Sequence, residues 1–118
     1  MTEPPSIIFV ETLVFTRRIS TLELEEPLRE LQLELLRNPE AGRLDPGTGG
    51  LRKVRISDPH RGKGKRGGAR VHYLWLSGPA VLYFIFVYGK DEASTLTQDQ
   101  KRQLKALVQA IKAEWAEE

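Results

Sequence analysis

Hydrophobic and polar positions alternate with two different periods along the chain, and each period predicts one kind of element. Residues 6–13, SIIFVETL, are rich in β-branched and aromatic side chains and predict a first strand. Residues 14–22 favour a short helix. Residues 25–37, EEPLRELQLELLR, place leucines at the spacing of one helical face, with Pro27 and acidic side chains in the first turn. The segment NPEAG ends this helix.

Further strands and a final helix are predicted in the second half of the chain. The strands cover residues 51–57, 69–77 and 81–88, and the SGPA turn between the last two predicts an antiparallel hairpin. Thr97 and Gln100 have the spacing of a capping box at the start of the final helix. Its apolar stripe, which we expect to be buried, consists of Leu104, Leu107, Val108, Ile111 and Trp115. The pattern predicts an α+β fold with about four strands.

Length and composition favour one domain. The chain has 118 residues and no cysteine, so we expect a single domain over residues 1–118, without disulfides. The start, MTEPPSIIFV, has no basic segment before a long apolar run, so we expect neither a signal peptide nor a membrane span. A cytoplasmic protein is the resulting expectation.

Basic residues are concentrated in the middle of the chain. The net charge is +2, but residues 43–72 hold nine Lys and Arg against two Asp, a local charge of +7. The other nine basic and fourteen acidic residues leave −5 for the rest of the chain. Clustered Lys and Arg side chains favour binding to a polyanion such as RNA, because they displace counterions from its phosphates. The alternative is a solvated loop whose charge has no specific partner.

Alternation within the segment LRKVRIS predicts where these charges point. Lys53 and Arg55 share one face of the expected strand, whereas Arg52 points to the other face. Arg70 begins the next expected strand. If the two strands pair, several cations converge on one sheet face near the basic loop, which we define as residues 58–69. The alternative interpretation is that these cations are ordinary surface residues.

Metal and nucleotide-cofactor chemistry is not expected. The two histidines, His60 and His72, have no acidic partners at metal-ligand spacing. The segment GKGKRGG lacks the fixed spacing of a phosphate-binding loop, and no helix is predicted to start beside it. We therefore expect no cofactor and no metal.

Several motifs in the sequence resemble those of one known family. They are NPEAG, GTGGLRKVR, GKGKRGGARVHY and VYGKDEASTLTQDQKRQL, in this order. Together they resemble the RelE superfamily of toxins from bacterial toxin–antitoxin pairs, most closely the HigB-type branch. The resemblance implies a twisted antiparallel sheet with helices on one side. It also implies a ribosome-dependent endoribonuclease that cuts messenger RNA in the ribosomal A site, and a cognate antitoxin as partner.

The resemblance also implies particular site residues. Matched position by position, the family's catalytic set falls on Lys53, Arg55, Arg70, Tyr88 and Lys90. The neighbouring cations that we expect to bind RNA are Arg52, Lys63, Lys65 and Arg66. The match has departures: Asp91 stands where several relatives have arginine, and the segment DEASTLT lacks a tyrosine that some relatives carry. Lys65 or Arg66 is expected to supply the missing charge.

The implied reaction is attack of an RNA 2′-hydroxyl on the adjacent phosphate. It needs a base, an acid and cations that stabilise the phosphorane. Lys53 or Lys90 is expected to transfer the proton, whereas the arginines at positions 55, 66 and 70 are expected to hold the phosphate. We expect Arg70 to be exposed. Tyr88 either stacks on a base or donates a proton, or else packs on the final helix.

Two alternatives stay open. His72 has an ordinary pKa suited to acid–base chemistry at neutral pH but matches no catalytic position of the family, so a core or sheet-surface histidine is the simpler interpretation. The whole protein is alternatively a non-catalytic RNA- or ribosome-binding module, in which phosphate contacts give salt-dependent affinity without cleavage. A structural protein whose charge is incidental would show neither property.

Overall fold

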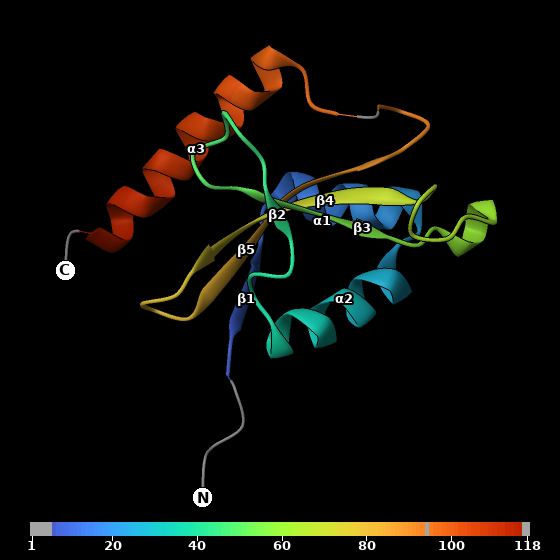
Figure 1. Ribbon diagram of the computed structural model, residues 1–118, viewed down its shortest axis with the longest axis horizontal. Coiled ribbons are helices and arrows are strands. Elements are labelled where there is room, and N and C mark those ends of the chain that lie inside the picture. The colour runs from blue at the N-terminus through green and yellow to red at the C-terminus, as the bar shows by residue number, and fades with distance from the viewer. Residues whose placement is uncertain (1–5, 94, 117–118) are drawn as a thin grey trace, which may run out of the picture.

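Helices and strands alternate in an α+β arrangement. The computed structural model describes residues 6–93 and 95–116 and is shown in Figure 1. No helix in these ranges is long and apolar enough to cross a membrane. The elements are β1 (Ile8–Glu11), α1 (Leu13–Leu22), α2 (Glu25–Arg37), β2 (Arg43–Leu44), β3 (Arg52–Ile56), a 3-10 turn (Pro59–Arg61), β4 (Ala69–Leu76), β5 (Val81–Gly89) and α3 (Gln98–Ala116).

The described strands form one mixed sheet of five strands in the order β1-β5-β4-β3-β2. β4 and β5 pair as the predicted antiparallel hairpin, but β1 pairs with β5 in parallel. The expectation of an antiparallel sheet of four strands is therefore wrong in strand number and in the direction of β1. The reason is that β1 and β5 lie far apart in the sequence, and β2 has only two residues, too few to show an alternating pattern.

Helices cover both faces of the sheet, which corrects the expectation of helices on one side only. α1 and α2 bury Phe15, Leu31 and Leu35 against Val71 and Phe84 on one face. A second, smaller core joins α3 to the opposite face; its buried members are Leu51, Leu74, Ile85, Val108 and Ile111. Each sheet face is apolar where a helix covers it. We call the sheet face that packs on α3 the α3 face. The part of this face that α3 leaves uncovered lies near the basic loop, at the far end of the sheet from the β4–β5 turn (Figure 1).

The final helix begins as its capping box predicts. The Gln100 backbone N–H donates to Thr97 Oγ1 (3.1 Å), and the Thr97 N–H donates to Gln100 Oε1 (2.9 Å). The predicted apolar stripe is only partly buried. Leu107 is 39 % exposed, so its expected burial is wrong, whereas Ile111 is 7 % exposed. Leu107 instead lines an open pocket between α1, β5 and α3.

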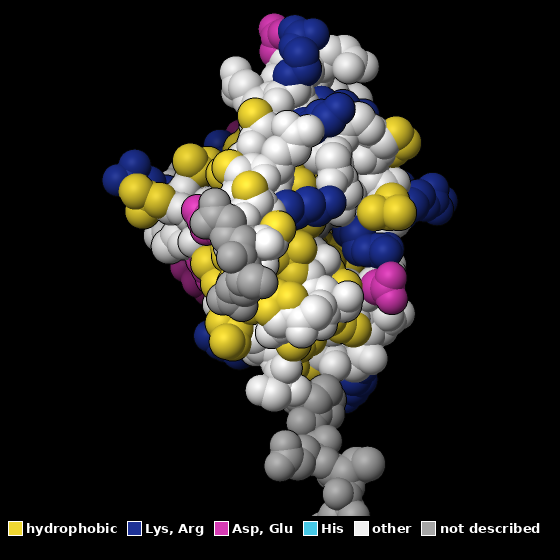
Figure 2. Space-filling model, turned by 90° about the vertical axis from the view of Figure 1, so that its left-hand side faces the viewer, with side chains coloured by type: hydrophobic (Ala, Val, Ile, Leu, Met, Phe, Trp, Pro, Cys, Tyr) yellow, Lys and Arg dark blue, Asp and Glu magenta, His cyan; other side chains and the backbone are white. Residues whose placement is uncertain are grey.

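Apolar side chains also gather on the side of the molecule that carries the β4–β5 turn and the C-terminal half of α3. Figure 2 shows this side, with separate Lys and Arg side chains around the apolar surface. Near the end of α3, Trp115 Nε1 donates to the Tyr83 hydroxyl (3.0 Å). The basic loop, residues 58–69, lies at the opposite end of the sheet (Figure 1).

Candidate nucleic-acid interface

Two cross-strand rows of side chains define the α3 face of the sheet near the basic loop. Lys53 on β3 lies opposite His72 on β4. One step along, Arg55 lies opposite Arg70, which in turn lies opposite Tyr88 on β5. Directly opposed residues in an antiparallel pair point to the same face. The structure thus brings four of the sequence-predicted catalytic residues, all except Lys90, onto one face.

Arg70 is a buried cation, and the expectation that it is exposed is wrong. Its residue is only 6 % exposed, because it sits on the inner strand β4 between β3 and β5. Its guanidinium donates to the backbone oxygens of Arg66 (3.2 Å) and Gly68 (3.4 Å). Burial and the neighbouring charge of Arg55 lower the pKa of Arg70, but a guanidinium stays charged at neutral pH.

The cations of this face have no acidic partners. Lys53, Arg55 and Arg70 form no ion pair with Asp or Glu anywhere in the described part of the chain. Arg55 is exposed and Lys53 is half-buried. A buried or partly buried charge is normally paired, so this face offers an unneutralised site for an anion.

A groove of about 670 Å³ is lined by residues of α2, β2, β3 and the basic loop. It gathers cations from three segments: Arg43, Lys53, Arg55, Lys65 and Arg66. Arg43 on β2 lies directly opposite Lys53 on β3 in the antiparallel pairing of these strands. We did not assign Arg43 to the site from the sequence, although its place in the basic segment was the available signal. The groove also contains Glu34, which lies 4.0 Å from Lys65, and Asp45.

Close packing at Gly68 shapes the basic loop. A Cβ atom at Gly68 would lie 2.0 Å from the Ile56 backbone oxygen and 2.8 Å from the Gly64 oxygen. Only glycine allows this approach, which brings the loop back against the end of β3. Within the loop, the backbones of Asp58 and Lys63 exchange hydrogen bonds of 2.7 and 2.9 Å. With the loop in this position, Lys65 and Arg66 line the groove.

Five of the predicted site residues do not line the groove: Arg70 and Tyr88 are buried in the sheet, and three others lie elsewhere. Lys63 turns toward the end of β5 and pairs with Asp91 at 2.6 Å, and its hydrogen bond lowers the pKa of Asp91. Lys90 is exposed beyond β5, where its backbone N–H donates to the Gly68 oxygen. Arg52 points to the α2 face and pairs with Glu40 at 3.0 Å. The structure therefore does not bring these side chains to the groove.

His72 and Tyr88 lie buried behind the cations. Their rings stack with centroids 5.8 Å apart. Burial raises the pKa of Tyr88. Burial also lowers the pKa of His72, and it outweighs the hydrogen bond that His72 Nε2 makes with Asp45 (2.8 Å). The sequence did not predict this contact because Asp45 lies in a different segment.

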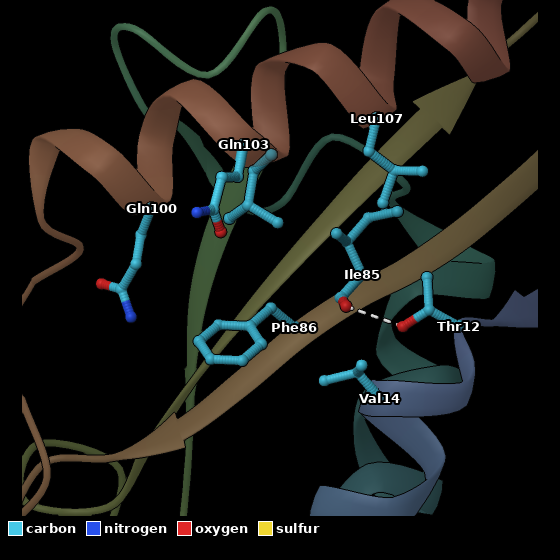
Figure 3. Close-up of a pocket in the computed structure, with 8 residues that line it drawn as sticks. Thr12, Val14, Ile85, Phe86, Gln100, Gln103 and Leu107 are labelled. Carbon is cyan, nitrogen blue, oxygen red and sulfur yellow. Dashed lines mark hydrogen bonds between the residues drawn. The ribbon is translucent and has the colours of Figure 1, made fainter.

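A separate apolar pocket of about 240 Å³ lies between α1, β5 and α3 (Figure 3). Figure 3 shows Val14 from α1, Phe86 from β5 and Leu107 from α3 around it, with the amides of Gln100 and Gln103. Thr12 Oγ1 at its rim donates to the Ile85 oxygen (2.8 Å). No Lys or Arg lines this pocket, so it does not suit a phosphate. The basic groove is the better candidate for RNA.

No cluster of metal-ligating side chains occurs in the ranges that the structure describes. The side chains of the interface carry guanidinium, ammonium, phenol, imidazole and carboxylate groups. No known protein-family model matches the chain.

Proposed function

We propose that the protein is the toxin of a toxin–antitoxin pair, a RelE-like, ribosome-dependent endoribonuclease that cuts messenger RNA during translation. The observation that carries this proposal is the unneutralised pair Arg55 and Arg70, with Lys53 beside it on the same sheet face. Such a set suits a phosphate whose charge increases in a transition state. The sequence motifs that resemble the RelE superfamily supply the reaction class.

The arrangement supports distinct roles for the cations. Arg70 is held by two backbone oxygens, so its guanidinium is fixed before RNA arrives. A donor that is already fixed need not rearrange when charge develops on a phosphorane oxygen, so it stabilises that charge at little cost in free energy. Arg55 opposite it provides a second donor from the exposed side. We assign both arginines to the scissile phosphate.

Proton transfer is assigned to Lys53 rather than Lys90. Lys53 lines the groove and is adjacent to the arginine pair, whereas Lys90 lies outside the groove. In this step the neutral amine form of Lys53 takes the proton of the 2′-hydroxyl while the 2′-oxygen bonds to phosphorus. The bond from phosphorus to the 5′-oxygen breaks, and the leaving oxygen takes a proton from a donor, for which Tyr88 is the candidate. Lys65, Arg66 and Arg43 would hold flanking phosphates along the groove.

A non-catalytic RNA- or ribosome-binding module is the second candidate function. Two observations favour it: Tyr88 is buried, and five of the eleven residues that line the groove are cations suited to phosphate contacts. In the toxin proposal, a cognate antitoxin and the ribosomal A site are the partners, because free nuclease activity would stop growth of the host cell. The binding module would need neither cleavage nor restraint.

Mapping of RNA ends separates the two functions. The protein is expressed from an inducible promoter, and new 5′ ends within translated messages are compared with those made by Arg55→Ala and by the control Arg37→Ala, an exposed arginine at the end of α2. The nuclease predicts new ends for the parent and for Arg37→Ala, but not for Arg55→Ala. Salt-sensitive association with ribosomes without new ends would establish the binding module instead.

A further inference from the structure

Two buried polar atoms behind the basic face have no hydrogen-bond partner in the described part of the chain. They are His72 Nδ1 and the Tyr88 hydroxyl. His72 is 0 % exposed and Tyr88 is 3 % exposed, and their rings stack with planes inclined by 24°. Folded proteins pair nearly all such atoms, and the exceptions are concentrated at functional sites. Two neighbouring exceptions on the candidate RNA face therefore need an explanation.

The Asp45 carboxylate determines which nitrogen of His72 carries the proton. Burial alone would raise the pKa of Asp45, but hydrogen bonds from His72 and Lys101 lower it, so Asp45 is ionised at neutral pH. An ionised carboxylate only accepts hydrogen bonds. His72 Nε2 must therefore donate to Asp45 Oδ2, over 2.8 Å. In the neutral ring this leaves Nδ1 as an acceptor without a partner, on the ring that stacks against the Tyr88 phenol.

Asp45 is itself held in place from two sides. Lys101 on α3 donates to Asp45 Oδ1 (3.2 Å) and to the Pro46 oxygen (3.1 Å). Within the turn after β2, Thr48 Oγ1 donates to the Asp45 backbone oxygen (2.7 Å) and accepts from the Leu51 N–H (3.1 Å). A carboxylate fixed by a turn and a helix fixes the imidazole bound to it, as a carboxylate does for a histidine in other proton-transfer sites.

The fixed ring borders the catalytic candidates. His72 lies opposite Lys53 on β3, and Tyr88 lies opposite Arg70 on β4. The charged and titratable groups that face the imidazole are thus Asp45 from the turn, Lys101 from α3, Lys53 from β3 and Tyr88 from β5. The Tyr88 hydroxyl lacks a hydrogen-bond acceptor, and the ring stacked on it carries an acceptor, His72 Nδ1, that has no partner.

We propose that Asp45 and His72 are positioning residues of the cleavage site that act through Tyr88: Asp45 locks the His72 ring with its proton on Nε2, and the stacked ring with its free Nδ1 orients the Tyr88 phenol beside Arg70. This inference rests on the proposed nuclease function. A purely structural core histidine would be expected to use both of its ring nitrogens. Here one nitrogen is used, and both the other nitrogen and the hydroxyl of the stacked Tyr88 ring stay without a partner.

A spectroscopic measurement tests the locked ring without reference to cleavage. The chain has only two histidines, so nitrogen NMR of histidine-labelled protein resolves His60 and His72 separately. We expect the proton of the neutral His72 ring to lie on Nε2, where it bonds Asp45. A His72 proton on Nδ1 would overturn the inference.

A double-mutant cycle tests the action through Tyr88. His72→Phe keeps the stacked ring but loses both nitrogens, and we expect kcat for cleavage of ribosome-bound message to fall about tenfold or more at unchanged KM. If His72 acts through Tyr88, the double variant with Tyr88→Phe should be no slower than Tyr88→Phe alone. His72→Gln, which retains an N–H for Asp45, serves as a second variant if His72→Phe does not fold. His60→Gln is the matched control and should be silent.

The outcomes distinguish this inference from the proposed function. Multiplicative losses in the double variant, or parental kcat in folded His72→Phe, would show that His72 does not position Tyr88. A parent protein that cuts no message would refute the nuclease function, and with it the cleavage role of His72. The NMR measurement would still report whether Asp45 locks the ring.

Discussion

Arg55 and Arg70 face each other across β3 and β4, and neither forms an ion pair with a carboxylate in the residues that the structure describes. Like charges at opposed positions of a sheet destabilise it. A protein that retains such a pair, with one partner buried, carries a cost that a bound phosphate would relieve. This relationship leads to the first prediction.

Replacement of Arg70 by Met should abolish cleavage without loss of stability. The Met side chain fills similar space, and removal of a buried, unpaired cation is expected to leave the melting temperature unchanged or to raise it. Arg70→Lys should restore little cleavage, because an ammonium cannot bind phosphate oxygens through a planar fork. Thermal unfolding and cleavage of ribosome-bound message are measured on the same preparations. Parental cleavage by folded Arg70→Met would place the reaction elsewhere.

The double variant Lys65→Gln, Arg66→Gln should weaken the salt dependence of RNA binding. Both side chains line the groove, and each lost phosphate contact should reduce the slope of log K against log salt by about 0.7 for single-stranded RNA. Fluorescence anisotropy across a range of KCl concentrations measures this slope. Lys63→Gln is the control and should change it less, because Asp91 already pairs with Lys63. Equal slopes for the double variant and the parent would remove the groove from the RNA path.

Gly68→Ala should destabilise the basic loop and the sheet end beneath it. The added Cβ would meet the Ile56 oxygen at 2.0 Å, so the backbone must shift, with an expected cost of about 1–3 kcal/mol in the free energy of unfolding. Gly64→Ala is a matched control in the same loop, since nothing lies within 4 Å of the position its Cβ would take. Denaturant unfolding of both variants gives the comparison. A Gly68→Ala variant as stable as Gly64→Ala would mean that the close approach is absent in solution.

The two sides of the α3 stripe should respond differently to truncation. Ile111→Ala removes a side chain from the core between α3 and the sheet and should cost about 2–5 kcal/mol in the free energy of unfolding. Leu107→Ala should cost much less, because Leu107 is 39 % exposed at the pocket margin. Urea unfolding measures both values. Equal losses would indicate that Leu107 is buried in solution, as the sequence pattern alone predicts.

Stability should depend on pH through His72. Burial lowers the pKa of His72 below its ordinary value of 6.5, so between the native value and 6.5 the unfolded chain binds more protons than the native chain. The free energy of unfolding must then rise with pH through this window and fall as the pH drops below 6.5. One such group contributes a slope of at most about 1.4 kcal/mol per pH unit.

His72→Gln should remove this dependence, and His60→Gln should retain it. Urea unfolding at several pH values between about 5 and 8 measures the slope. The contribution of Asp45 does not interfere, because its lowered pKa affects stability only below its ordinary value of 3.8. The same slope in His72→Gln and in the parent would assign the pH dependence to another group.

Local features followed from the sequence because neighbouring residues alone determine them. The leucine spacing predicted α2 over the residues it occupies, Glu25–Arg37, and the capping box of Thr97 and Gln100 marked the start of α3. The SGPA turn predicted the β4–β5 hairpin. Alternation along β3 placed Lys53 and Arg55 together, since strand geometry sends every second side chain to the same face.

Features that join distant segments needed the tertiary structure. The parallel pairing of β1 with β5, and the packing of α3 on the opposite face from α1 and α2, depend on contacts that no local period contains. The same holds for charges. Arg70 is buried because β4 lies between β3 and β5, Lys63 leaves the groove for Asp91, and Arg43 enters the groove by pairing with β3.

The candidate RNA interface shows most clearly which features the sequence determines and which depend on the tertiary structure. Sequence by itself determined that a chain of +2 net charge concentrates +7 in one segment, and so indicated a surface for a polyanion. Only the tertiary structure decided which of those cations lie together, and it placed Asp45 against His72 from a separate turn. The physical reason is that side-chain direction is a property of each strand, whereas burial and pairing depend on what the rest of the fold brings into contact with it.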